Sequence, residues 1–162
     1  MRFFWRAIHW IVEMLKIIGA ACLAGMTFLT CVDVVGRFFQ HPIFGSVEIV
    51  AFMATLTVAM AMPYTHYLKA HIGVEIVVRQ FSPKTQRIVD FFTGILSLGL
   101  FGIVTWRMAC YALDIQRSGE VSMNLELPIH AIIYVVSFCF LIFALVILQD
   151  VVQNIMKLRE EK

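Results

Sequence analysis

The sequence predicts an all-α integral membrane protein with four transmembrane helices, both termini in the cytoplasm, and an N-terminal amphipathic helix at the membrane interface. Three observations predict this fold class: the hydrophobic composition, four long apolar runs, and the distribution of lysine and arginine. Of the 162 residues, 60% are hydrophobic and 15% are charged, whereas a soluble domain carries about 25% charged residues. The mean hydropathy of +0.85 is typical of a chain that lies in a bilayer.

Four apolar runs are long enough to cross a bilayer. A helix needs about 20 apolar residues to span about 30 Å of hydrocarbon. The runs lack the alternation over about ten residues that marks the strands of an outer-membrane barrel. The sequence therefore predicts a single membrane domain, residues 1–162, with spans at about 17–36, 47–68, 88–113 and 127–149.

The basic residues predict the orientation of these spans, because cytoplasmic loops carry an excess of Lys and Arg. With four spans, the N-terminal segment, the connection between spans two and three, and the C-terminal tail lie on one side. These three regions hold ten of the thirteen basic residues: Arg2, Arg6, Lys16, Lys69, Arg79, Lys84, Arg87, Lys157, Arg159 and Lys162. We therefore expect both termini in the cytoplasm and the corner RSGEVSMNLELP on the outer side.

The first sixteen residues show helical periodicity of their own. Polar residues recur at spacings of three and four in an otherwise apolar segment, as Arg2, Arg6, His9, Glu13 and Lys16. This pattern predicts a helix at residues 1–16 that lies in the cytoplasmic interface, with these side chains at headgroup level: Arg2, Trp5, Arg6 and Trp10. An early, tilted start of the first span is the alternative. A signal peptide is disfavoured, since the apolar run is long and no A-x-A-like site follows it.

Ionisable residues near the outer ends of the spans form the first candidate site. Asp33 and Arg37 are four residues apart, so they share one face of the first helix. Arg107 lies inside the outer end of the third span, within reach of Asp33 or Glu48. Because an isolated charge is costly in a membrane, we expect an interhelical cluster of Asp33, Arg37, Glu48 and Arg107. This cluster is interpreted either as a structural pin or as an ion site.

The residue pattern argues against several other functions. All five histidines fall in the flanks or at the ends of the spans, whereas a membrane cytochrome needs paired histidines deep in the bundle. The four cysteines lie within the spans without a C-x-x-C motif, and no hydrolase, metalloprotease or phosphate-loop motif occurs. The basic residues form no cluster suited to nucleic acid. We therefore expect no enzyme activity, no metal site and no cofactor in this chain.

The centres of the four spans carry no charge. A self-contained secondary transporter carries an ionisable group near the middle of the membrane, where the coupling ion or substrate binds. A chain without such a group is better suited to support another polypeptide that has one.

Four motifs in a fixed order resemble one known family. DVVGRFF at residues 33–39 is followed by HPIFGSVEI (41–49), AHIGVEIV (70–77) and RSGEVSMNLELPIHAIIY (117–134). Together with the four spans and the expected topology, they resemble the small membrane subunit (Q, or DctQ-type) of tripartite ATP-independent periplasmic (TRAP) transporters. The resemblance extends over nearly the whole chain.

The resemblance implies a non-catalytic scaffold subunit of a Na⁺-coupled transporter in the bacterial inner membrane. In that family a periplasmic binding protein delivers a small organic anion, such as a dicarboxylate, a sialic acid or a sulfonate. A large, elevator-type M subunit holds the substrate and Na⁺ sites. The implied partners of this chain are the M subunit, the binding protein and lipids, and no nucleic acid; Na⁺ is expected in the M subunit.

The resemblance also implies two contact surfaces. A docking surface for the binding protein is expected at the outer residues Gln40, His41, Asp114, Arg117, Glu120 and Asn124. A cytoplasmic contact with the M subunit is expected at His71 and Glu75. The alternative that stays open is an independent homo-oligomeric carrier or channel, whose ion site would be the Asp33, Arg37, Glu48 and Arg107 cluster.

Overall fold

The computed structural model describes residues 2–68 and 83–160, and within these ranges the fold is all-helical. The helices are α1 (Arg2–Phe38), α2 (Ser46–Tyr67), α4 (Pro83–Ser118) and α5 (Ile129–Glu160). Each contains a segment long and apolar enough to cross a membrane: Ile8–Phe38, Ser46–Tyr67, Phe91–Ser118 and Ile129–Gln153. The prediction of an all-α protein with four candidate spans is therefore confirmed.

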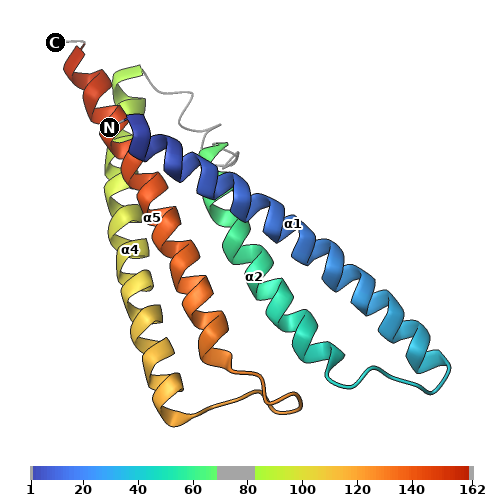
Figure 1. Ribbon diagram of the computed structural model, residues 1–162. Coiled ribbons are helices and arrows are strands. Elements are labelled where there is room, and N and C mark those ends of the chain that lie inside the picture. Colours follow the sequence, from blue (N-terminus) through green and yellow to red (C-terminus); the bar gives the residue numbers. More distant parts are fainter. Residues whose placement is uncertain (1, 69–82, 161–162) are drawn as a thin grey trace.

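The four helices form two hairpins (Figure 1). α1 packs on α2, α4 packs on α5, and α5 joins the two pairs through its contacts with α2 and, less extensively, with α1. Figure 1 shows both termini at one end of the bundle and the connections 39–45 and 119–128 at the other. We call this second end the loop end. In this view the two hairpins diverge toward the loop end, where loop 119–128 reaches across toward the start of α2.

The core lies along α5, which is the most deeply buried of the four spans. One cluster joins three helices; its fully buried members are Ile8, Val12 and Leu15 of α1, Ala59 and Met60 of α2, and Val136, Cys139, Ile142 and Val146 of α5. A second cluster between α4 and α5 is centred on Phe143, Ile147 and Val151. The spans α1 and α4 expose most of their apolar side chains, as expected for surfaces that face lipid or another subunit.

The N-terminal segment differs from the expected boundary at residue 16. α1 runs without a break from Arg2 to Phe38, because no helix-breaking residue separates Lys16 from Ile17. Trp5 packs against the core, whereas Arg6 and Trp10 are exposed. The interfacial position of residues 1–16 stays a prediction, but the segment is continuous with the first span.

Aromatic contacts attach this N-terminal segment to the end of α2. The ring of His9 meets the ring of Tyr67 edge-on at a centroid distance of 4.4 Å. The ammonium group of Lys16 lies 4.5 Å from the ring centroid of Tyr64 and 3.1 Å from the Glu13 carboxylate. His9 and Lys16, two of the recurring polar residues of this segment, therefore contact α2.

Candidate functional site

Asp33 connects the end of α1 to the turn that follows it. One carboxylate oxygen accepts a hydrogen bond from Nε of Arg37 at 2.8 Å, and the other accepts one from the backbone N–H of Ile43 at 3.0 Å. Asp33 is buried, while about half of the Arg37 side chain remains exposed. The pair with Arg37 follows from helical spacing, but the bond to Ile43 depends on how the turn folds back.

Glu48, in the first turn of α2, binds loop 119–128. Its Oε1 accepts hydrogen bonds from the backbone N–H of Asn124 at 2.9 Å and from the side-chain amide of the same residue at 2.8 Å. Its Oε2 accepts hydrogen bonds from the backbone N–H of Leu125 at 3.1 Å and from the Ser122 hydroxyl. Both carboxylate oxygens are thus occupied by loop donors, and the first hairpin is attached to the second at the loop end.

Loop 119–128 also has internal structure. The backbone N–H of Ser122 donates to the carbonyl of Leu127 at 3.0 Å, next to an isolated antiparallel bridge between Val121 and Pro128. At the start of α2, Gly45 has a φ of 73°, and the position of its missing Cβ is filled by the side chain of Leu125. A glycine at this position allows α2 and the loop to approach closely.

The structure does not bring Arg107 to the other three predicted cluster residues. Arg107 is exposed on α4, and α4 packs on α5 rather than on α1 or α2. Within residues 2–68 and 83–160, no hydrogen bond or ion pair joins Arg107 to Asp33 or Glu48. The expected four-residue cluster is corrected to two separate arrangements, because the carboxylate of Glu48 binds backbone and side-chain donors of the loop instead of a guanidinium.

The six residues predicted for docking all lie at or near the loop end and are exposed: Gln40, His41, Asp114, Arg117, Glu120 and Asn124. Asn124 is additionally bound to Glu48. The predicted cytoplasmic residues His71 and Glu75 lie outside the described residues. Sequence reasoning missed Ser122 and Leu125, although the short polar run that contains Ser122 and Asn124 was a usable signal for a structured loop.

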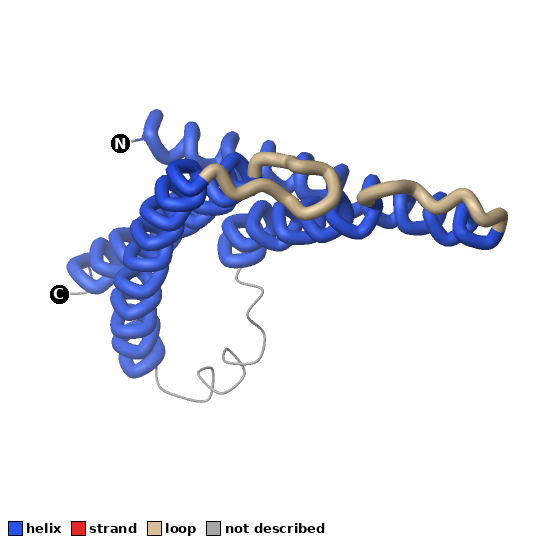
Figure 2. The backbone as a smooth tube through the Cα atoms, turned by 90° about the horizontal axis from the view of Figure 1, so that it is seen from below, coloured by secondary structure: helices blue, strands red, loops and turns tan. Residues whose placement is uncertain are grey.

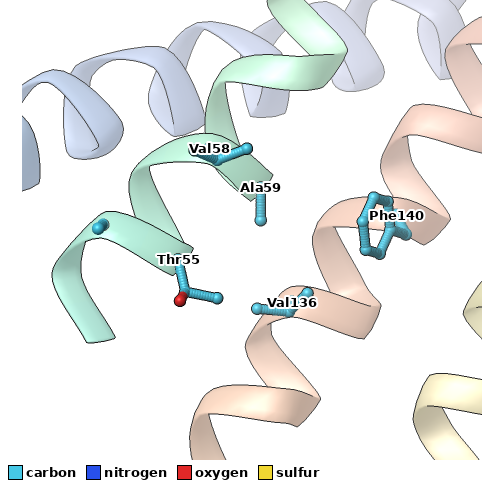
Figure 3. A pocket seen from close by; sticks show the side chains of 6 residues that line it. Thr55, Val58, Ala59, Val136 and Phe140 are labelled. Atoms are coloured by element: carbon cyan, nitrogen blue, oxygen red, sulfur yellow. The ribbon is translucent and has the colours of Figure 1, made fainter. Parts of the chain in front are cut away.

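The middle of the bundle contains an apolar groove of about 420 Å³ between α2 and α5 (Figure 3). Its lining residues are Ala54, Thr55, Val58, Ala59, Val136 and Phe140. The one hydroxyl among them, on Thr55, donates to the carbonyl of Ala51 at 2.9 Å. No ionisable side chain lines the groove, and the described part of the chain holds no group of three metal-ligating side chains. The groove can accommodate an apolar group but offers no ligand for an ion.

A comparison with protein families decides the identity of the chain. The model described as "Tripartite ATP-independent periplasmic transporters, DctQ component" matches residues 26–157. The chain belongs to this family. As a DctQ component it is a small, multi-pass membrane subunit of a TRAP transporter, in agreement with the resemblance of its motifs. No curated protein and no solved structure matches the chain.

The match places the loop end of this DctQ component within the family region. Residues 26–157 include Asp33, Glu48 and the whole of loop 119–128. The contacts of the two carboxylates therefore lie within the matched region, whereas residues before 26 lie outside it.

Removing the Asp33 carboxylate is expected to loosen the turn between α1 and α2. Asp33→Ala leaves the N–H of Ile43 without its acceptor and Arg37 without its counter-ion, so the unfolding temperature of the purified subunit should fall. Asp33→Asn retains one carbonyl oxygen for Ile43, so its unfolding temperature should lie between those of Asp33→Ala and the wild type. Asp114→Asn, at an exposed position, is the control. Equal values for Asp33→Ala and Asp114→Asn would contradict the role of the buried carboxylate.

Proposed function

We propose that this chain is the non-catalytic scaffold subunit of a Na⁺-coupled TRAP transporter that imports a small organic anion. In this role it braces the large, elevator-type M subunit in the inner membrane and helps to dock the periplasmic binding protein. Its termini face the cytoplasm and its loop end faces the periplasm. The substrate and Na⁺ sites belong to the M subunit.

The observation that supports a scaffold most directly concerns the middle of the spans. In the described part of the chain, no side chain that could bind an ion or a polar solute lines the groove there. The groove between α2 and α5 is apolar, and its hydroxyl already has a backbone partner. A transporter needs polar groups or broken helices at this depth to replace the hydration shell of an ion. Asp33, Arg37 and Glu48 lie at the loop end. Lys16, paired with Glu13, lies beside Tyr64, and Asp150 lies beside His66, both near the last turns of α2.

The exposed surface supports a role in assembly. α4 exposes large apolar side chains along its length, among them Phe92, Leu96, Ile103 and Trp106. α1 also exposes large apolar side chains, among them Leu23 and Phe28. These apolar helix surfaces are suited to pack against the static part of a larger membrane protein, because helix association in lipid depends on van der Waals packing.

The alternative is an independent homo-oligomeric carrier or channel with an ion site at Asp33, Arg37, Glu48 and Arg107. The contacts argue against this site. Arg107 lies on α4, which packs on α5 and not on α1, where Asp33 and Arg37 lie. Both oxygens of Glu48 already accept hydrogen bonds from loop 119–128.

The scaffold function is tested by expressing the chain with and without the M-type permease and the periplasmic binding protein of its transporter. We expect copurification with the permease, and loss of binding-protein-dependent uptake when this chain is deleted. Arg107→Gln should leave copurification and uptake close to wild type. Uptake into liposomes that contain this chain alone, abolished by Arg107→Gln while the chain still assembles, would establish the alternative instead.

A further inference from the structure

We propose that loop 119–128 is a strap across the loop end of the bundle. Its hydrogen bonds to Glu48 hold the two hairpins at a fixed opening, and without these bonds the hairpins splay apart. This inference goes beyond the proposed function, because it concerns a movement within the chain itself and requires no partner. We call the end of the bundle at which both termini lie the terminal end (Figure 1).

The two hairpins are packed together toward the terminal end. Ala59 and Met60, in the second half of α2, are buried in the core cluster that α2 shares with α1 and α5. Beyond them, Nε2 of His66 lies 3.2 Å from Oδ2 of Asp150, and the His66 ring meets the ring of Phe143 edge-on. The chain also passes from the first hairpin to the second at this end, where α2 ends and α4 begins. Apolar packing, a polar contact and chain connectivity therefore all hold the hairpins together there.

Packing between the hairpins stops before the loop end. Between Ser46 and Ala59 no residue of α2 is buried, and part of this stretch lines the apolar groove of about 420 Å³. Figure 3 shows Thr55 of α2 and Val136 of α5 on opposite sides of this groove. From here toward the loop end the hairpins diverge (Figure 1). Apolar packing between α2 and α5 therefore does not set their separation at the loop end.

The contact that joins the hairpins at the loop end is the one between Glu48 and the strap. Four hydrogen bonds reach the Glu48 carboxylate, from the backbone N–H groups of Asn124 and Leu125 and from the side chains of Ser122 and Asn124. Hydrogen bonds to an ionised carboxylate are stronger than those between neutral groups. The strap, which connects α4 to α5, is thereby fastened to the first turn of α2.

Without this fastening, the first hairpin can pivot about the contacts at the terminal end. Lipid gives α2 and α5 no hydrophobic drive to close, because acyl chains are as apolar as a neighbouring helix. Met60 lies twelve residues beyond Glu48, which makes a lever of about 18 Å. A rotation of about 15°, as in rigid bodies that turn about an interface, would move the end of this lever by about 5 Å. The strap thus fixes the angle between α1 and α4, the two helices that expose most of their apolar side chains.

The test measures distances between paired spin labels by double electron–electron resonance, in the full chain in lipid nanodiscs. The cysteines other than Cys139, which is fully buried, are first replaced by serine. Labels are then attached at four exposed positions of α1 and α4, one pair near the loop end and one pair near the terminal end: Val35→Cys with Leu113→Cys, and Met14→Cys with Phe92→Cys.

Glu48→Gln weakens the fastening with little change of shape. One acceptor oxygen becomes an amide that donates, so at least one hydrogen bond from the strap is lost together with the charge. We expect the loop-end distance to increase by about 5 Å with a broader distribution, while the terminal-end distance stays unchanged. Ser122→Ala combined with Asn124→Ala removes the two side-chain donors and leaves both backbone donors, so we expect a smaller increase.

Glu126→Gln is the matched control. Glu126 lies in the strap, is exposed, and makes no hydrogen bond or ion pair within residues 2–68 and 83–160. Its replacement removes the same charge as Glu48→Gln and should change neither distance.

Three results would overturn the inference. An unchanged loop-end distance in Glu48→Gln and in the Ser122→Ala, Asn124→Ala double variant would show that the strap does not set the opening. A shorter loop-end distance would show that the loop holds the hairpins apart rather than together. A terminal-end distance that changes as much as the loop-end distance would show that Glu48 supports the whole bundle and not one end of it.

Discussion

Replacing Ile147 with alanine is expected to lower the free energy of unfolding of the subunit by about 2–5 kcal/mol. Ile147 is 1% exposed. Together with Phe143 and Val151 it forms the buried cluster of α5 that packs against α4. Removing three carbon atoms leaves a cavity that lipid cannot fill from outside. In a bilayer the helices associate through close packing rather than through exclusion of water, so the lost contacts act directly on the α4–α5 pair. Equilibrium unfolding of the purified subunit in detergent measures the effect.

Leu148→Ala is the matched control for this prediction. Leu148 is the next residue on the same helix, has the same number of side-chain atoms, and is 37% exposed. Its replacement should cost less than about 1.5 kcal/mol, because its exposed atoms face detergent or lipid in both the variant and the wild type. Equal losses in the two variants would mean that the cluster at Ile147 is not a packed core.

Replacing Gly45 with alanine is expected to destabilise the loop end by two separate effects. The φ of 73° places the residue in the left-handed region, where an L side chain costs about 1–2 kcal/mol. The added Cβ would also overlap the side chain of Leu125, so that side chain or the loop that carries it must shift. Overpacking of this kind costs a further amount of about 1–3 kcal/mol. The unfolding temperature of the subunit should fall accordingly.

Gly119 separates the two effects. Its φ of 70° is nearly the same, but no atom lies within 4 Å of the position of an added Cβ. Gly119→Ala should therefore show the backbone cost alone and remain more stable than Gly45→Ala. Combining Gly45→Ala with Leu125→Ala should recover the steric part, which a double-mutant cycle resolves. If Gly45→Ala and Gly119→Ala have the same unfolding temperature, Leu125 does not press against Gly45.

Properties that depend on local sequence were predicted well. The spans were recognised because length and hydropathy are features of each segment by itself, and their centres agree with the helices observed. The Asp33–Arg37 pair followed from four-residue spacing on a helix. The boundary at residue 16 differed, because periodicity reports which face of a helix is polar but does not indicate where a continuous helix leaves the interface.

The residues that donate hydrogen bonds to Glu48 could not be predicted from spacing or hydropathy. Pairing it with Arg107 assumed that the third span lies beside the first two, whereas α4 packs on α5 and is separated from α1 and α2. Figure 2 shows loop 119–128 lying alongside the α1–α2 hairpin when the bundle is viewed from the loop end. Which backbone N–H groups meet Glu48 depends on this crossing, and no pattern within either segment encodes it.

The amino-acid sequence by itself determined that the chain has four membrane-spanning helices, leaves their centres uncharged and belongs among TRAP transporter subunits. Those properties arise from composition, spacing and motif order, which act within segments of about 20 residues. Only the tertiary structure decided that the two hairpins are joined at the loop end by Glu48. The reason is that hydrogen bonds between residues more than 70 positions apart exist only after the helices have packed.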